Sequence, residues 1–331
     1  MYKRQCHGSS LIDSDDPWHA AQRRVVAQGF THKQMQLYEG HVREVATRLV
    51  DQVATVGSCD VVASIAKPLP MTLIGEMLGA EPADYDRLQH WSDQMIGGAD
   101  DPVYVTDDVA NAAFAYIMFI TEIIADRRLN PRDDLVSTLV HAAIDDGQSL
   151  DENHVIGNSL LLLVGGNETT RSAITGGMHA LLTHPDQMAL ALASIVDGSV
   201  GPTVIEEILR WVTPLNNMNR VTTQDVEVRG VTIPAGSQVL MSYISANRDE
   251  EVFEDPFRFD VTRDHNPHLS FGFGPHLCLG AQLARLELKI IVSEMLTRLH
   301  DIRLADPDFV AAYSHSSFVR GIQSLPITFT V

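Results

Sequence analysis

Residues 271–280 read F-G-F-G-P-H-L-C-L-G and lead directly into the helical run A-Q-L-A-R-L-E-L-K. The loop places Cys278 at the start of a helix, where unpaired N–H groups and the helix dipole stabilise a thiolate. Gly272 and Gly274 permit backbone conformations that other residues avoid, and Gly280 would let another group approach the backbone closely. Such a loop can hold a sulfur toward a flat, bulky partner, with Phe271 packed beside it.

Haem iron is a partner of this kind, and a thiolate axial ligand favours O–O cleavage. Three other interpretations compete. Cys278 could be a small buried apolar residue. A dinucleotide-binding loop would need glycine at Leu277, so it is excluded. His265, His268 and His276 could join Cys278 in a zinc site, but their spacing matches no common zinc pattern and no C-x-x-C pair accompanies them.

The string and its helix closely resemble the cysteine-ligand loop of the cytochrome P450 family. The resemblance implies a mainly α fold, helix-rich with a small β region. It also implies haem b (iron protoporphyrin IX) as cofactor, with Cys278 as the iron ligand. We expect residues 1–331 to form one such domain. The family's first sheet and helices are expected to be missing, because its H-x-x-x-R helix begins here near Pro17.

Composition fits this interpretation. The chain has 331 residues, of which 45% are hydrophobic and 20% charged, as in a globular protein with a sizeable core. Its longest apolar stretches, such as 112–120 and 160–164, are shorter than the ~18 residues of a membrane span. Cys6, Cys59 and Cys278 are too widely spaced for a disulfide framework, which predicts a soluble protein of the cytoplasm. The net charge of −19 argues against nucleic acid as a partner.

Helical spacing dominates the chain. Apolar residues three and four apart predict helices over residues 17–28, 32–56, 70–78, 82–96, 106–128, 151–182, 185–195 and 204–211. Alternation predicts strands over 226–228, 231–233 and 238–243, then an irregular meander over 247–267 and a terminal hairpin over 316–331. The helix after Cys278 should end near Leu299. Without its upstream sheet partners, strand 238–243 should present an unpaired edge.

Residues 160–170 of the long apolar helix read L-L-L-L-V-G-G-N-E-T-T. Glycine costs a helix ~1 kcal/mol relative to alanine, and such violations commonly mark functional sites. Gly165 and Gly166 would let a flat ligand lie against the helix, while Glu168 and Thr169 could hold water and relay protons. Alternatively, the Thr169 hydroxyl bonds back to the helix backbone. The string resembles the oxygen-activation helix of cytochromes P450.

Two further groups of residues match the family. Glu207 and Arg210, three residues apart, share a helix face. The resemblance implies that they are buried with an arginine from the meander, Arg258, in a structural role.

Haem propionates need cationic partners. The resemblance supplies four candidates: His19 and Arg23 on the first helix, Arg220, and His276 in the cysteine loop.

The implied activity is monooxygenation, in which one oxygen atom of O2 enters an organic substrate. Electrons would come from NAD(P)H through a ferredoxin or flavodoxin, which a local basic face could attract. Arg23, Arg24, Arg285 and Lys289 are the candidates for that face. A haem-binding fragment without turnover and a peroxide-driven peroxygenase are the alternatives. The intact Glu168–Thr169 pair disfavours the peroxygenase.

The substrate is implied less directly. Residues 166–171 (G-N-E-T-T-R) and 245–247 (S-A-N) resemble bacterial members that hydroxylate sterol side chains, terpenoids or similar lipids. The candidate pocket-lining residues are Leu162, Gly165, Gly166, 215–218 and 317–318.

Overall fold

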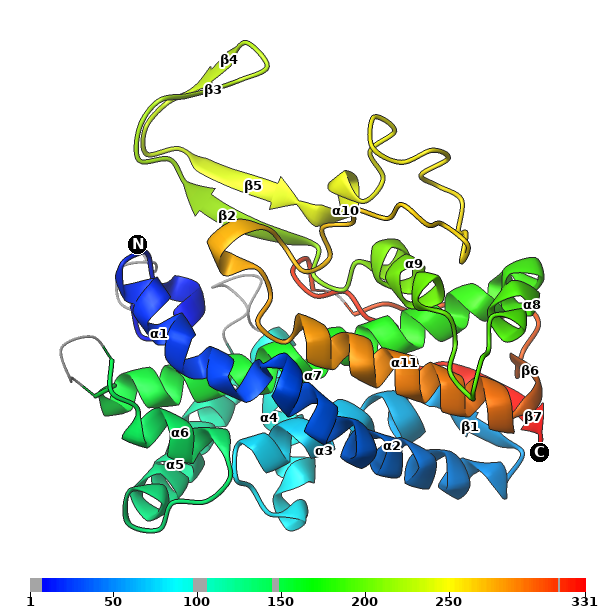
Figure 1. Ribbon diagram of the computed structural model, residues 1–331, viewed down its shortest axis with the longest axis horizontal. Coiled ribbons are helices and arrows are strands. Elements are labelled where there is room, and N and C mark those ends of the chain that lie inside the picture. The colour runs from blue at the N-terminus through cyan, green and yellow to red at the C-terminus, as the bar shows by residue number, and fades with distance from the viewer. Residues whose placement is uncertain (1–7, 98–105, 145–148, 315) are drawn as a thin grey trace.

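The long helix α7 (Glu152–Thr183) runs through the centre of the protein (Figure 1). The structure is a computed structural model that describes residues 8–97, 106–144, 149–314 and 316–331. Asp151 caps the start of α7, where its side chain accepts a hydrogen bond from the N–H of His154. Pro185 begins the next helix just after α7 ends. Helices α3, α4, α5, α6, α8, α9 and α11 all contact α7.

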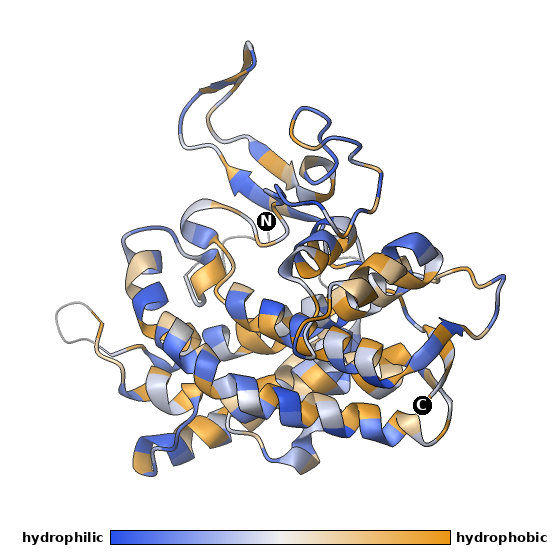
Figure 2. Cartoon of the chain, turned by 45° about the vertical axis from the view of Figure 1, so that its right-hand side comes forward, coloured by the Kyte–Doolittle hydropathy of each residue, from blue (hydrophilic) through white to orange (hydrophobic). Residues whose placement is uncertain are grey.

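Most of the other helices pack on α7 or on its neighbours. Their bounds are α1 Trp18–Val26, α2 His32–Ala54, α3 Pro68–Met77, α4 Tyr85–Gly97, α5 Asp107–Leu129, α6 Leu135–His141, α8 Pro185–Ala193, α9 Pro202–Val212, α10 Tyr243–Ala246 and α11 Ala281–Arg298. Buried apolar side chains from Ala21 to Phe329 form one continuous core. Figure 2 shows the alternation of hydrophobic and hydrophilic residues along these helices.

Three small antiparallel sheets complete the fold. Strands β1 (Ser58–Asp60), β7 (Pro326–Thr330) and β6 (His300–Leu304) form one sheet in that order. Strand β2 (Asn217–Val221) pairs with β5 (Gln238–Ser242), and β3 (Val226–Val228) pairs with β4 (Val231–Ile233). The β2–β5 and β3–β4 pairs extend away from the helical body (Figure 1). Among the described strands β5 pairs with β2 alone, so its other edge is unpaired, as predicted.

All eight predicted helices upstream of Cys278 are present, with ends displaced by a few residues. Helices α6 and α10 and strands β1, β2 and β6 were not predicted from the sequence. The predicted hairpin over residues 316–331 is wrong. The chain turns back earlier, with the N–H of Ser314 bonded to the carbonyl of Gly321 at 2.8 Å, and β7 then pairs with the distant β1 and β6.

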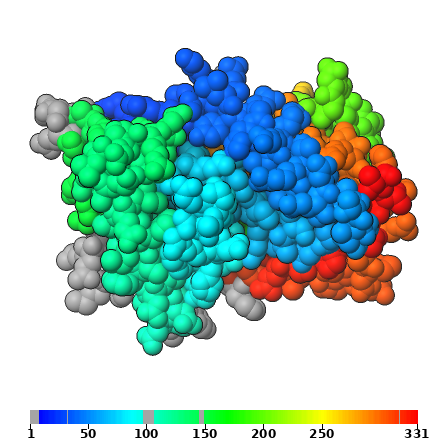
Figure 3. Space-filling model, turned by 90° about the horizontal axis from the view of Figure 1, so that it is seen from below, coloured from blue at the N-terminus to red at the C-terminus, as the bar shows by residue number. Residues whose placement is uncertain are grey.

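The sequence predicted no segment long and apolar enough to cross a membrane, and helix α5 is an exception to that prediction. Among the helices that the structure describes, it alone meets that test of length and composition, with a mean hydropathy of 1.5. One of its faces packs into the protein through Tyr116, Ile120 and Ile124, which are fully buried. Figure 3 shows the opposite face at the molecular surface, in the turquoise to green part of the colour scale.

Candidate active site

The cysteine loop is held by its own backbone. The N–H of Cys278 donates to the carbonyl of Phe271 at 2.8 Å, and the N–H of Leu277 donates to the carbonyl of Gly274 at 3.0 Å. Gly272 and Gly274 have φ values of +72° and +73°, in the left-handed region that favours glycine. Both glycines therefore adopt a backbone conformation that other residues avoid, as predicted.

The thiol of Cys278 is less acidic than the sequence predicted. The residue is exposed, yet nearby protein atoms desolvate the sulfur and raise its pKa. The N–H of Gly280 and the charges of Arg23 and Arg285 lower the pKa, but by less. The start of α11 therefore lowers the pKa of Cys278, as predicted, but desolvation raises that pKa by more. A metal cation at the sulfur would supply the missing stabilisation, because coordination deprotonates a thiol outright.

The four predicted propionate-binding residues gather beside this loop. The rings of His19 on α1 and His276 lie 4.1 Å apart, and Nη2 of Arg23 donates to the carbonyl of Leu277 at 2.7 Å. Desolvation lowers the pKa of His276, and so do the nearby charges of His19, Arg220 and Arg23, while Asp15 opposes them.

These side chains fit an anionic cofactor. Nδ1 of His19 lies 3.1 Å from a carboxylate oxygen of Asp16, but its buried Nε2 has no hydrogen-bond partner among the described residues. Arg220 is exposed and bonds through Nη1 to its neighbour's carbonyl. Donors collected around an unmatched buried nitrogen are what two haem propionates require.

The two glycines of α7 differ in their surroundings. Gly165 is exposed, and a Cβ placed there would meet only Cδ1 of Leu161, at 3.9 Å. A Cβ on Gly166 would lie 2.6 Å from Cδ1 of Ile74, so α3 packs directly against this residue. Gly165 therefore leaves open space beside the helix, as a flat ligand would need, whereas helix packing accounts for Gly166.

The Thr169 hydroxyl donates to the carbonyl of Gly165 at 2.7 Å, as the alternative interpretation predicted. This bond uses the hydroxyl proton and leaves the oxygen lone pairs available to accept.

Glu168 belongs to a polar network that the sequence did not reveal. It is buried and ion-paired with Arg171, whose Nη1 reaches Oδ1 of Asp93 on α4 at 2.8 Å. Nζ of Lys67 lies 2.9 Å from Oδ2 of the same carboxylate. The pKa of Glu168 is raised to about 8, because burial raises it by more than Arg171 lowers it and Asp93 raises it as well. A pKa raised in this way lets Glu168 hold a proton near neutral pH.

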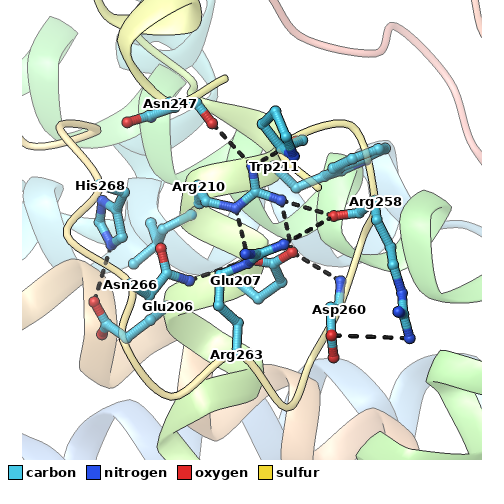
Figure 4. Close-up of polar contacts among 12 residues, drawn as sticks. Glu206, Glu207, Arg210, Trp211, Asn247, Arg258, Asp260, Arg263, Asn266 and His268 are labelled. Atoms are coloured by element: carbon cyan, nitrogen blue, oxygen red, sulfur yellow. Dashed lines mark hydrogen bonds and ion pairs between the residues drawn. The ribbon is translucent and has the colours of Figure 1, made fainter. Parts of the chain in front are cut away.

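Glu207 and Arg210 of α9 form the buried centre of a second network (Figure 4). Nε and Nη2 of Arg210 each donate to Glu207 at 2.8 Å. The remaining donors of Arg210 reach the carbonyls of Asn247, Pro256 and Arg258 at 2.8–2.9 Å.

The prediction that the Arg258 side chain completes this group is wrong. That side chain is 61% exposed and lies 3.9 Å from Asp260, and only its backbone carbonyl joins the network. Arg263 takes its place, with Nε 3.4 Å from Oε2 of Glu207 and a side chain that is 11% exposed (Figure 4). Asp255 has a φ of +47°, and this local bend in the meander lies between the pair and the two arginines.

Asn247 connects this network to the cysteine loop. Its buried amide donates to Thr213 and to Ser270, both at 2.9 Å, and its Oδ1 accepts from the N–H of Leu269 at 2.7 Å. Ser270 directly precedes Phe271, so α9 and the meander fix the chain that enters the loop.

A third ion pair holds the loop from the side of α11. Glu206 accepts two hydrogen bonds from Arg285, at 2.7 and 2.9 Å, and one from His268 at 2.9 Å. Burial alone would raise the pKa of Glu206, but these bonds hold it at about 2. Arg285 also lies over the ring of Phe271, 4.5 Å from its centre. The positive charge of Arg285 is therefore matched inside the protein.

The zinc interpretation finds no support. Across the described ranges no three histidine, cysteine, aspartate or glutamate side chains gather as a metal site would require.

Two predicted pocket-lining segments lie side by side. The N–H of Asn216 donates to the carbonyl of Phe318 at 2.9 Å, and Nδ2 of Asn217 donates to that of Ser317 at 2.9 Å.

Comparisons with known proteins agree with this geometry. A family model described as Cytochrome P450 matches residues 201–304. The chain is 43% identical to a steroid C26-monooxygenase of Mycobacterium tuberculosis, over 97% of this chain and 86% of that protein. It is 40% identical to a methyl-branched lipid omega-hydroxylase of Mycobacterium bovis, over 97% of this chain and 75% of that protein.

Solved structures give the same result. The bacillaene polyketide synthase cytochrome P450 PksS of Bacillus subtilis superposes with a TM-score of 0.90 at 32% identity, covering 100% of this chain and 84% of that one. CYP109E1 of Bacillus megaterium in complex with testosterone gives a TM-score of 0.89 at 32% identity, covering 98% and 84%.

Proposed function

Because this chain belongs to the cytochrome P450 family and is a haem b-dependent monooxygenase, we propose that it hydroxylates a steroid or a methyl-branched lipid. Relatives named for these two substrate classes match 97% of the chain at 40–43% identity. The observation that carries the haem-dependent chemistry is the glycine loop that holds Cys278 beside Arg23, Arg220 and Nε2 of His19, which is unpartnered among the described residues.

The cofactor would be held from two sides of the loop. Cys278 would bind the iron, and His19, Arg23, Arg220 and His276 would bind the propionates. Phe271 would pack beside the sulfur. A Cβ built on Gly280 meets no atom within 4 Å, and Gly165 faces open space, so both glycines leave room for a flat ring system. Bound there, haem b supplies oxygen activation, which a thiolate ligand favours.

The network around Glu168 would hold and deliver protons. Glu168 keeps its proton at neutral pH, while Asp93 and Lys67, each with a 33% exposed side chain, connect it to solvent. The next residue, Thr169, can accept a hydrogen bond from a water at its hydroxyl oxygen, because its proton is directed to Gly165. An acid followed by an ordered alcohol can thus pass protons from the surface toward the open side of α7.

Residues 1–331 would act as one cytoplasmic domain that receives electrons from a ferredoxin or flavodoxin. Arg285 is bound to Glu206, so an attracting basic surface would depend on Arg23, Arg24 and Lys289. Long-range attraction of this kind weakens as salt concentration rises.

Two measurements on the haem-loaded chain test the substrate class. A sterol with an intact side chain and a methyl-branched fatty acid are titrated separately, with a straight-chain fatty acid as control, and the Soret spin shift is recorded. We expect a shift with the sterol or the branched lipid at lower concentration than with the control. Equal responses to all three would contradict the proposed specificity.

Turnover is then compared with NAD(P)H plus a ferredoxin system and with peroxide alone. Product in the first mixture supports the proposal. Product with peroxide alone would identify a peroxygenase. No product in either, despite a spin shift, would identify a haem-binding protein without turnover.

A further inference from the structure

Helix α5 carries an apolar surface that its position in the fold does not explain. Along its outer face Asn111, Phe114, Met118, Thr121 and Ala125 follow one another at alternating intervals of three and four residues. Phe114 is 66% exposed and Met118 is 50% exposed. This spacing is that of a seam along which two helices pack.

The outer face is also free of charge over most of its length. From Val109 to Thr121 the helix has no ionisable group other than Tyr116, which is buried on the inner face. Ile117, which is 39% exposed, widens the apolar strip. In a chain of net charge −19, an uncharged apolar strip of this length on the surface indicates a contact site.

Charged residues lie outside the uncharged stretch 109–121, with Asp107 and Asp108 before it and Glu122, Asp126, Arg127 and Arg128 after it. Asp107 and Asp108 lie in the first turn of α5, and neither has an ion-pair partner among the residues that the structure describes. Arg128 lies in the last turn, where Nη1 bonds Glu152 at 2.7 Å and other N–H groups remain available.

The five positions of this strip, 111 to 125, are centred between Ile117 and Met118, which is also midway between Asp107 and Arg128. Two copies of α5 packed antiparallel would therefore bring Phe114 of each near Thr121 of the other. The same arrangement places the Asp107 of each copy beside the partner's Arg128, twice per pair. A parallel arrangement would instead place acid beside acid.

We propose that the outer face of α5 binds a second copy of this chain, in a two-fold symmetric, antiparallel helix pair. Such an interface is self-complementary, as a closed dimer requires. The helix dipoles also favour the antiparallel direction.

A lipid surface is the other conceivable occupant, and the charges disfavour it. Binding to anionic membranes depends on lysine and arginine beside the apolar face. Residues 107–126 contain neither, and Asp107, Asp108 and Glu122 would be repelled.

The test measures the association of the haem-loaded chain by sedimentation velocity over a range of concentrations. We expect a concentration-dependent dimer. Replacement of the apolar strip by Phe114→Glu or Met118→Gln should raise the dissociation constant at least ~10-fold, or about 1.4 kcal/mol. Leu37→Gln on α2, also an exposed apolar position, should leave it unchanged. Circular dichroism confirms that each variant folds, and Met118→Gln keeps the test valid if Phe114→Glu does not.

Charge exchange tests the orientation. Asp107→Arg alone and Arg128→Asp alone should each weaken the dimer, and the double variant Asp107→Arg/Arg128→Asp should restore it. A chain that stays monomeric, or a dimer unaffected by the substitutions at Phe114 and Met118, would overturn the proposal. A double variant weaker than both single variants would overturn the antiparallel arrangement. Monomeric chain that binds phosphatidylglycerol vesicles through Phe114 would assign the face to a membrane instead.

Discussion

Replacing Arg210 by methionine should lower stability strongly. The substitution removes the cation that donates two hydrogen bonds to buried Glu207 and three to backbone carbonyls. Breaking a buried ion pair from one side costs about 3–5 kcal/mol, because the other charge stays buried. Arg263, 3.4 Å from Glu207, still offers a weaker partner, which places the cost near the lower end of that range.

The expected shift in melting temperature follows from chain length. Unfolding entropy is about 2.1 cal/mol/K per residue, or about 0.7 kcal/mol/K for 331 residues. A loss of about 3 kcal/mol then corresponds to a fall of about 4 °C. Thermal unfolding of the haem-loaded Arg210→Met chain, followed by far-ultraviolet circular dichroism, measures it.

Matched variants decide whether the reasoning is right. Arg258→Met removes an exposed side chain and should change the melting temperature by less than about 1 °C. Arg263→Met should cost more than Arg258→Met. The double variant Glu207→Gln/Arg210→Met no longer leaves a buried carboxylate without its cation. It should therefore recover part of the melting temperature that Arg210→Met loses. An Arg258→Met variant as unstable as Arg210→Met would refute the assignment of the network.

Three further outcomes concern protons. Thr169→Ala should keep substrate binding but divert electrons to peroxide, because no hydroxyl oxygen remains to order water. The ratio of product to NAD(P)H consumed measures this diversion. An unchanged ratio would show that the hydroxyl serves the helix structure alone. Asp93→Asn should lower the pKa of Glu168, because Asp93 raises it. The ratio of product to NAD(P)H consumed should then begin to fall at a lower pH than in the unaltered chain. Glu287 is buried and its pKa is raised to about 8 from 4.5 by desolvation, so the folded chain holds a proton that the unfolded chain loses, and stability should fall as pH rises between these values. The free energy of unfolding should fall by about 5 kcal/mol at most, at ~1.4 kcal/mol per pH unit. Thermal melts at pH 5 and pH 8 measure this difference in stability, and Glu287→Gln should make it smaller. An unchanged pH dependence in Glu287→Gln would contradict the burial of an unpaired acid.

The sequence predicted the features that depend on neighbouring residues. The Cys278 loop is such a feature, because Gly272, Gly274 and the following helix are adjacent in the chain. The helices were also predictable, since their apolar spacing is local. Some ends moved by a few residues, as in α3, which was predicted over 70–78 and begins at Pro68.

Features that depend on distant residues were missed. Arg258 and Arg263 are five residues apart in an irregular segment, so no periodic spacing in the sequence indicates which one faces Glu207. The network of Lys67, Asp93 and Glu168 joins separate helical segments, so no spacing in the sequence reveals it.

The central claim is that Cys278 holds haem iron as a thiolate, and the absorption spectrum of the reduced, CO-treated protein tests it. We expect the strongly red-shifted Soret band of a thiolate ligand in the unaltered chain and its loss in Cys278→Ala. Cys59→Ala should keep the band, because Cys59 lies in strand β1, paired with Ile327 of β7, and not in the cysteine loop. Cys6→Ala, outside the described residues, should keep it too. A Cys278→Ala protein that retained the red-shifted band would contradict the account.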